Sequence, residues 1–202
     1  MIQKLKLQLS LCYVITLFAC GFSHYASAEY IQFTFTGEVT EIGGSLWDPW
    51  LDTQLGDPVT VQYVFDSNAP DHSGSQNSGL YPFLNLTFAI GDIVQTALSG
   101  AIWVDNDISY WGDDQYSVIF GFGSELTGAF SFSGFDMFSS DALSTDLDWT
   151  QYATSHVGMI GFDSDNDHFI RYQFSSWNVT VVPGAPTFLA LLFGVSYRRR
   201  RQ

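Results

Sequence analysis

Apolar and polar residues alternate along most of the chain between residues 31 and 182, and short polar turns interrupt the alternation. Ile31, Phe33 and Phe35, for example, are separated by Gln32 and Thr34. A period of two places successive side chains on opposite faces of a β-strand. No window of about 12 residues in this region has a helical period. The pattern therefore predicts a body of short strands, each with one buried face.

We expect strands at residues 31–36, 59–63, 83–90, 102–104, 116–120, 130–132, 159–162, 169–174 and 177–182. Turns rich in Gly, Pro, Asn and Asp separate them. Short strands with such spacing favour an all-β fold, a single antiparallel β-sandwich of jelly-roll-like type over residues 29–182. Two segments rich in Ser and Asp, residues 71–79 and 133–154, are expected to be loops.

The charge of the chain is concentrated in this body. The 202 residues include 21 acidic and seven basic residues, a net charge of −14. All 21 acidic residues lie in residues 29–182, where Arg171 is the one lysine or arginine, so the body alone carries −20. Such a body repels nucleic acid and anionic lipid headgroups. Neutral glycans, cation-rich surroundings and simple solubility all remain compatible with it.

The N-terminal residues 1–28 have the pattern of a secretory signal peptide. Two lysines precede a mostly apolar run over residues 9–22, and Ala26-Ser27-Ala28 has the form of a signal-peptidase site. Cleavage after Ala28 would make Glu29 the first residue of the mature protein. The only two cysteines lie in this leader, so the mature body has no disulfide and no thiolate site. A second reading is a lipoprotein signal, in which Cys20 carries the lipid.

The C-terminal residues 183–202 form a second targeting segment. An apolar run over residues 187–197 follows two prolines, and a cluster of arginines ends it, which is the charge pattern of the cytoplasmic side of a membrane. The residues of this tail are Pro183, Pro186, Arg198, Arg199, Arg200 and Arg201. This ending resembles the PEP-CTERM sorting signal, with Pro183-Gly184-Ala185-Pro186 in place of Pro-Glu-Pro.

The resemblance implies an exported protein that is anchored in the inner membrane in transit and then reaches the cell surface or the extracellular space. Its partners would be signal peptidase and an exosortase-type sorting enzyme, and its surroundings the exopolysaccharide matrix. Residues 31–120 also resemble the secreted sandwich that is common in this family, notably at Phe33–Val39, Gly56–Val59 and Tyr63–Ser67. That body has no general enzymatic activity, so we expect no catalytic residue and no cofactor.

Two acidic clusters are compatible with a calcium site. Asp163, Asp165 and Asp167 alternate with Ser164 and Asn166, and hard cations prefer such oxygen ligands. The same residues are typical of a solvated hairpin turn between the strands at 159–162 and 169–174. A weaker cluster, with the same two interpretations, is formed by Asp105, Asp107, Asp113 and Asp114.

A carbohydrate site is the remaining hypothesis. Trp47-Asp48-Pro49-Trp50 has the composition of an exposed turn that carries two indole rings, a surface on which a sugar can stack. Alternatively, these rings are part of the core. A glycosidase, which needs two carboxylates at a fixed separation, is a second alternative, but no motif selects a pair.

Overall fold

The computed structural model describes residues 29–46, 48–107, 113–123, 126–161 and 168–182. The expected leader and tail, residues 1–28 and 183–202, lie outside these ranges, as do their residues Ala26, Ala28, Pro183, Pro186 and Arg198–Arg201. The described part of the chain includes no helix that is long and apolar enough to cross a membrane.

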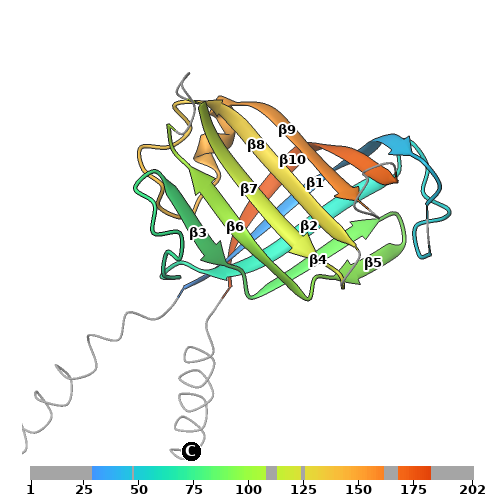
Figure 1. Ribbon diagram of the computed structural model, residues 1–202, viewed down its shortest axis with the longest axis horizontal. Helices are drawn as coiled ribbons and strands as arrows, with labels where there is room; N and C mark the ends of the chain where they lie inside the picture. The colour runs from blue at the N-terminus through green and yellow to red at the C-terminus, as the bar shows by residue number, and fades with distance from the viewer. Residues whose placement is uncertain (1–28, 47, 108–112, 124–125, 162–167, 183–202) are drawn as a thin grey trace, which may run out of the picture.

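The described residues form ten strands in one continuous sheet (Figure 1). The strands are β1 (Tyr30–Gly43), β2 (Pro58–Asp66), β3 (Ser78–Pro82), β4 (Asn85–Ile90), β5 (Ile93–Thr96), β6 (Ser99–Asp105), β7 (Asp113–Gly121), β8 (Thr127–Phe135), β9 (Ala153–Gly161) and β10 (Phe169–Val182). Their order in the sheet is β3-β6-β7-β8-β9-β10-β1-β2-β4-β5. Every pairing is antiparallel, which confirms the predicted antiparallel all-β class.

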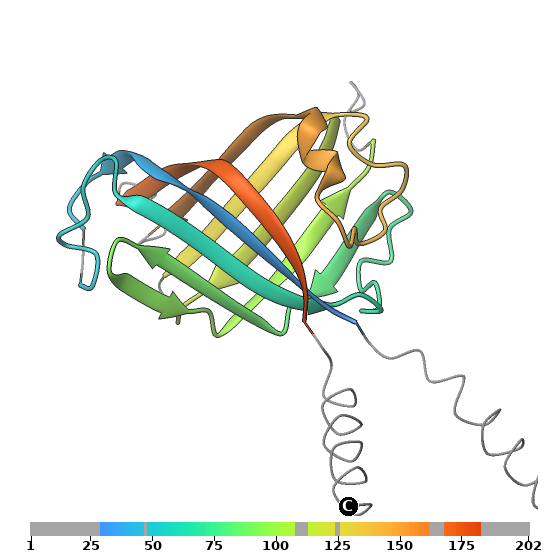
Figure 2. The ribbon, with the colours of Figure 1, turned by 180° about the vertical axis from the view of Figure 1, so that it is seen from behind.

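The period of two in the sequence is the period of burial in the strands. In β1, Ile31, Phe33 and Phe35 are buried, while Gln32 and Thr34 lie on the outer face. The sheet curls, so that its inner face encloses the core and its outer face meets solvent (Figures 1 and 2). One face of each strand is thus removed from water, which is the main favourable term in folding.

Aromatic side chains fill the interior and join strands that are not neighbours in the sheet. The ring of Phe35 in β1 lies 5.4 Å from that of Phe130 in β8. The hydroxyl groups of Tyr63 in β2 and Tyr116 in β7 are 2.7 Å apart and fully buried. Burial raises the pKa of both phenols, so the pair stays neutral and one hydroxyl donates to the other.

The strands differ from the expected ones in three places. Residues 78–82 form β3, although their N-terminal part was expected to belong to a loop. Strand β5 is short, and its sequence Ile-Val-Gln-Thr has too little alternation to be recognised. The two strands expected at 169–174 and 177–182 are one strand, β10, which pairs along its length with β1. A bulge at Thr36 and Gly37 accommodates that long pairing, and the Gln173 carbonyl lies where a Cβ of residue 37 would be.

A loop covers each end of the curled sheet. Residues 44–57 connect β1 to β2 at one end, and residues 136–152 connect β8 to β9 at the other (Figure 2). The second loop contains the 3₁₀ turn η1 (Asp148–Tyr152), which lies within the long loop expected at residues 133–154.

Candidate functional site

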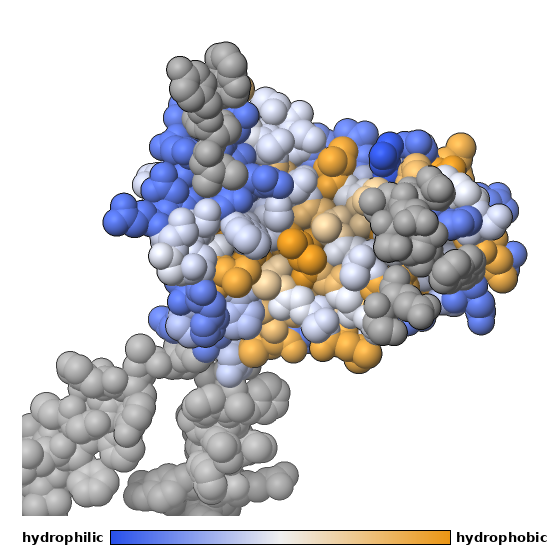
Figure 3. All heavy atoms as spheres, in the orientation of Figure 1, coloured by the Kyte–Doolittle hydropathy of each residue, from blue (hydrophilic) through white to orange (hydrophobic). Residues whose placement is uncertain are grey.

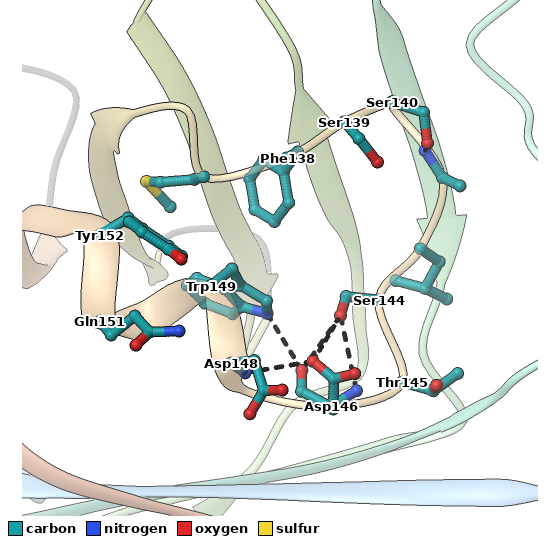
Figure 4. A pocket seen from close by; sticks show the side chains of 13 residues that line it. Phe138, Ser139, Ser140, Ser144, Thr145, Asp146, Asp148, Trp149, Gln151 and Tyr152 are labelled. Atoms are coloured by element: carbon teal, nitrogen blue, oxygen red, sulfur yellow. Dashed lines mark hydrogen bonds between the residues drawn. The ribbon is translucent and has the colours of Figure 1, made fainter.

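The loop at residues 136–152 surrounds a cleft with a volume of about 530 Å³. Figure 4 shows its side chains arranged around the opening between the two arms of the loop. The cleft is lined by Met137, Phe138, Ser139, Ser140, Ala142, Leu143, Ser144, Thr145, Asp146, Asp148, Trp149, Gln151 and Tyr152. Its volume lies in the range that is usual for small-molecule sites, and it combines aromatic, hydroxyl and carboxylate groups.

Trp149 is fixed against the core at the base of this loop. Its ring stacks on Tyr116 at 4.6 Å and meets Phe132 edge to face at 5.2 Å. Its indole N–H donates to the Asp146 carbonyl at 3.1 Å. The side chain is 4% exposed. Trp149 is therefore a rigid wall of the cleft rather than a mobile surface group.

Tyr152 is the exposed ring of the cleft. It ends η1, and 53% of the residue is exposed. Phe138, on the opposite arm, lies 5.5 Å from Trp149. Tyr152 and the half-buried Phe138 give the cleft apolar faces of the kind that pack against the C–H faces of sugars, and the buried Trp149 supports Phe138 from beneath. The sequence pattern favoured Trp47 and Trp50 over Trp149 as a sugar platform and gave no role to Tyr152, because residues 133–154 were expected to be a loop.

Asp146 organises the polar side of the cleft. Its Oδ1 accepts a hydrogen bond from the Asp148 backbone N–H at 3.1 Å and one from the Ser144 hydroxyl at 3.4 Å. The Thr150 hydroxyl donates to the Leu147 carbonyl at 2.6 Å, which tightens the turn that follows. These bonds leave the exposed side chains of Asp148 and Gln151 at the opening.

Asp114 connects the cleft loop to the sheet. This fully buried carboxylate accepts hydrogen bonds from the backbone N–H groups of Asp107, at 2.9 Å, and Phe138, at 2.8 Å. The second bond ties one arm of the cleft to the start of β7. Hydrogen bonds to a buried charged group contribute more to stability than neutral ones. Asp114 is therefore a positioning residue for the cleft.

The charge around the cleft is negative. Among the described residues, Asp146 and Asp148 line it, and no lysine or arginine does. Arg171, the one such residue in residues 29–182, is paired with Glu41 at 2.6 Å on the outer face of the sheet. The cleft accordingly suits a neutral or cationic ligand better than an anionic one.

The two expected tryptophans do not form an exposed pair. Trp50 is fully buried in the loop at residues 44–57, where its ring meets Phe88 edge to face at 5.7 Å. A ring with no exposed face cannot stack on a sugar, so the core interpretation of Trp50 is the correct one in this structure. Trp47 lies outside the described residues.

The expected calcium ligands are placed only in part. Asp163, Asp165 and Asp167 lie outside the described residues, although the strands on either side of them, β9 and β10, pair as expected. In the second cluster, Asp114 binds backbone N–H groups, and Asp105 accepts a hydrogen bond from the Trp103 indole at 2.6 Å. Within the described ranges, no three His, Cys, Asp or Glu residues are placed to hold a metal ion.

Comparison of the chain with protein families, with curated proteins and with solved structures finds no match.

Proposed function

We propose that this chain is an exported, non-enzymatic protein of the cell surface or extracellular matrix, and that it holds matrix polysaccharide in the cleft of residues 136–152. The observation that carries the proposal is the cleft itself. It places the exposed ring of Tyr152 and the fixed ring of Trp149 beside hydroxyl and carboxylate groups. Aromatic faces with convergent hydrogen-bonding groups are the chemistry that a sugar needs.

The two ends of the sequence support export. The leader pattern ending at Ala28 and the tail from Pro183 to Arg201 motivate a path through signal peptidase, membrane anchoring and an exosortase-type enzyme. This part of the proposal rests on the resemblance to the PEP-CTERM type. Its test is the intact mass of the natively expressed protein, together with its cellular fraction. A chain from Glu29 to a residue near Pro183, found outside the cell, supports it, whereas a chain that retains the leader and stays in the cytoplasm contradicts it.

The finer fold proposed is a jelly-roll-like sandwich. Its support is that opposite parts of the curled sheet pack inner face against inner face, as Phe35 packs on Phe130 and Tyr63 on Tyr116. A sandwich of this kind presents loops at both ends, and such loops carry most binding sites of β-proteins.

The ligand class follows from the charge. A neutral or amino-containing polysaccharide can approach a body of −20, whereas a polyuronate is repelled. The test is electrophoresis of the native protein in gels that contain a neutral, a cationic or a uronic-acid polysaccharide. We expect retardation by a neutral or cationic polymer and none by the polyuronate.

The matched variants are Tyr152→Ala and Phe135→Ala. Both rings are more than half exposed, at 53% and 57%, but only Tyr152 lines the cleft. We expect Tyr152→Ala to weaken the retardation strongly and Phe135→Ala to preserve it. Equal behaviour of the two variants, or no retardation in any gel, would overturn the proposed binding function.

Calcium and catalysis are tested in the same gels. The Asp163–Asp167 turn is proposed as a calcium site only if a chelator weakens retardation and added calcium restores it. Asp146 and Asp148 both line the cleft, so a glycosidase is the competing function. Release of reducing sugars by the wild type, and its loss in Asp148→Asn, would replace the non-enzymatic proposal.

A further inference from the structure

The outer face of strands β6 to β9 carries apolar side chains that the rest of the described residues leave exposed. Ile119 in β7 is 47% exposed and Val157 in β9 is 48% exposed. Trp103 in β6 is also exposed, and its indole is fixed by the hydrogen bond to Asp105. Figure 3, which views this face, shows hydrophobic residues over the middle of these strands. Contiguous exposed apolar surface of this kind usually marks an interaction site.

The register of the strands places small side chains between larger ones on this face, which leaves a trough. Ile119 stands opposite Ala129, which stands opposite Met159. In the neighbouring row, Ser117 and Ser131 lie between Trp103 and Val157. Small side chains therefore occupy the middle and larger ones the borders. The result is a groove of about 330 Å³ along β7, β8 and β9.

The middle of the same face carries no acidic residue. Strands β8, β9 and β10 contain no acidic residue, and those of β6 and β7 are confined to the end at Asp105, Asp113 and Asp114. At the other border, Arg171 is paired with Glu41. On a body that carries −20, this is a surface where a second equally acidic molecule meets little repulsion.

On the outer face of β1, β2 and β4, by contrast, most of the solvent-facing side chains are polar. The outer positions of β1, β2 and β4 include Gln32, Thr34, Thr60, Gln62 and Thr87, all polar and only partly exposed. The Gln62 amide even bonds the Thr34 hydroxyl across the strands at 3.3 Å. Val94 in β5 is exposed as well, at 59%, so what distinguishes β6 to β9 is that the exposed apolar groups there line a groove.

We propose that this face of β6 to β9 is the contact between two copies of the chain. A second copy fits because a two-fold axis can place the Ile119 side of one copy over the trough of Ala129 and Ser131 in the other. Four strands about 4.8 Å apart, with seven residues of about 3.3 Å rise, give about 440 Å² of face per copy. The total of about 890 Å² lies in the range of transient contacts, so the dimer is weak and reversible.

The dimer would have one cleft of residues 136–152 on each copy. If the proposed function is correct, this makes the protein bivalent for a polymer, and binding to long chains gains affinity without any new contact. The dimer itself does not depend on that function. If the protein does not bind polysaccharide, it should still dimerise. The two proposals can therefore fail separately.

The test is sedimentation of the purified protein over a wide concentration range, at low and high salt. We expect a concentration-dependent monomer–dimer equilibrium that salt strengthens, because salt screens the repulsion between the acidic bodies. Ile119→Glu should weaken the dimer about tenfold or more, since each copy brings the new charge to the axis. Thr60→Glu, which adds the same charge to the outer face of β2, should leave it unchanged.

Ser131→Arg is the second variant, because it fills the trough without removing an apolar side chain and so guards against a folding defect in Ile119→Glu. A wild type that is monomeric at every concentration would overturn the proposal, and so would a dimer that neither variant weakens. A monomer whose Ile119 and Val157 NMR signals shift with a neutral oligosaccharide would assign this face to a glycan instead.

Discussion

The two ends of the curled sheet are each closed by a loop that carries a tryptophan, but the two tryptophans pack differently. In residues 44–57, Trp50 is fully buried against Phe88 and closes one end of the core. In residues 136–152, Trp149 stacks on Tyr116 and leaves an open cleft beside it. Trp50 completes the core, whereas Trp149 packs on the core and forms a wall of the cleft. The same residue type therefore has a structural role at one end and a proposed binding role at the other.

Both loops combine backbone and side-chain hydrogen bonds. In residues 44–57, the Gln54 backbone N–H donates to Asp57 Oδ2 at 2.8 Å, and backbone bonds join Thr53 to Trp50 and Gly56 to Val39. In residues 136–152, the Asp148 backbone N–H donates to Asp146, and the Phe138 backbone N–H donates to Asp114 of β7. The second loop is thus tied to a buried carboxylate of the sheet.

The strongest test of the comparison is Trp50→Ala. Removing this buried ring leaves a large cavity, so the free energy of unfolding should fall by about 3–5 kcal/mol. Denaturant titration measures the loss. Trp50→Phe should cost much less, because the indole N–H of Trp50 has no hydrogen-bond partner among the described residues. The folded fraction of either variant should bind polysaccharide normally, and a specific loss of binding would show that this end is also functional.

Asp114→Ala should have the next largest effect. It leaves two backbone N–H groups without their acceptor, which should cost about 2–3 kcal/mol, and it frees one arm of the cleft. We expect weaker polysaccharide binding measured by titration calorimetry at a temperature where the variant is folded. Asp92→Ala, an exposed site in the turn between β4 and β5, is the control and should change neither property. Normal binding by Asp114→Ala would remove its positioning role.

The Tyr63–Tyr116 pair tests whether the support beneath Trp149 matters. Each single change to Phe leaves one buried hydroxyl without a partner and should lower stability by about 1–2 kcal/mol. The double variant should lose less than the sum of the two, because no orphaned hydroxyl remains. Thermal or denaturant unfolding of all four proteins measures this coupling. Strict additivity would mean that the hydroxyl pair contributes no mutual stabilisation.

Tyr152→Ala should have the smallest effect on stability and a large one on function. The side chain is mostly exposed, so the free energy of unfolding should change by no more than about 0.5 kcal/mol. Affinity for a neutral oligosaccharide should nevertheless fall about tenfold, because an exposed ring of the cleft is lost. Calorimetry gives both quantities. A stability loss that matches the affinity loss would instead indicate a structural role.

The sequence predicted the fold class better than the site. Alternation such as that of Ile31, Phe33 and Phe35 is imposed by burial, so it reports strands directly. The curl of the sheet, by contrast, depends on contacts such as Tyr63 with Tyr116, which are 53 residues apart and leave no local signal. The order of the strands could therefore not be read from their spacing.

The position of the cleft could not be predicted from the sequence, for a related reason. Trp50, in a turn with Asp48 and Pro49, has the local composition of an exposed ring, but its neighbour Phe88 lies in a distant strand and buries it. Trp149 and Tyr152 occupy a Ser- and Asp-rich loop that looks merely flexible in sequence. Only the placement of β7 beneath that loop, through Asp114 and Tyr116, makes it a cleft.

The most direct test of the account is an NMR titration of the isotope-labelled protein with a neutral oligosaccharide, observed at the tryptophan indole N–H signals and the amides of residues 136–152. If sugar binds in the cleft of residues 136–152, the indole signal of Trp149 and the amides around Tyr152 should shift in a saturable way, while the indole signal of Trp50 should not move. Shifts at Trp50 and the loop of residues 44–57, or no shift at the 136–152 cleft with any neutral or amino-sugar oligosaccharide, would contradict it.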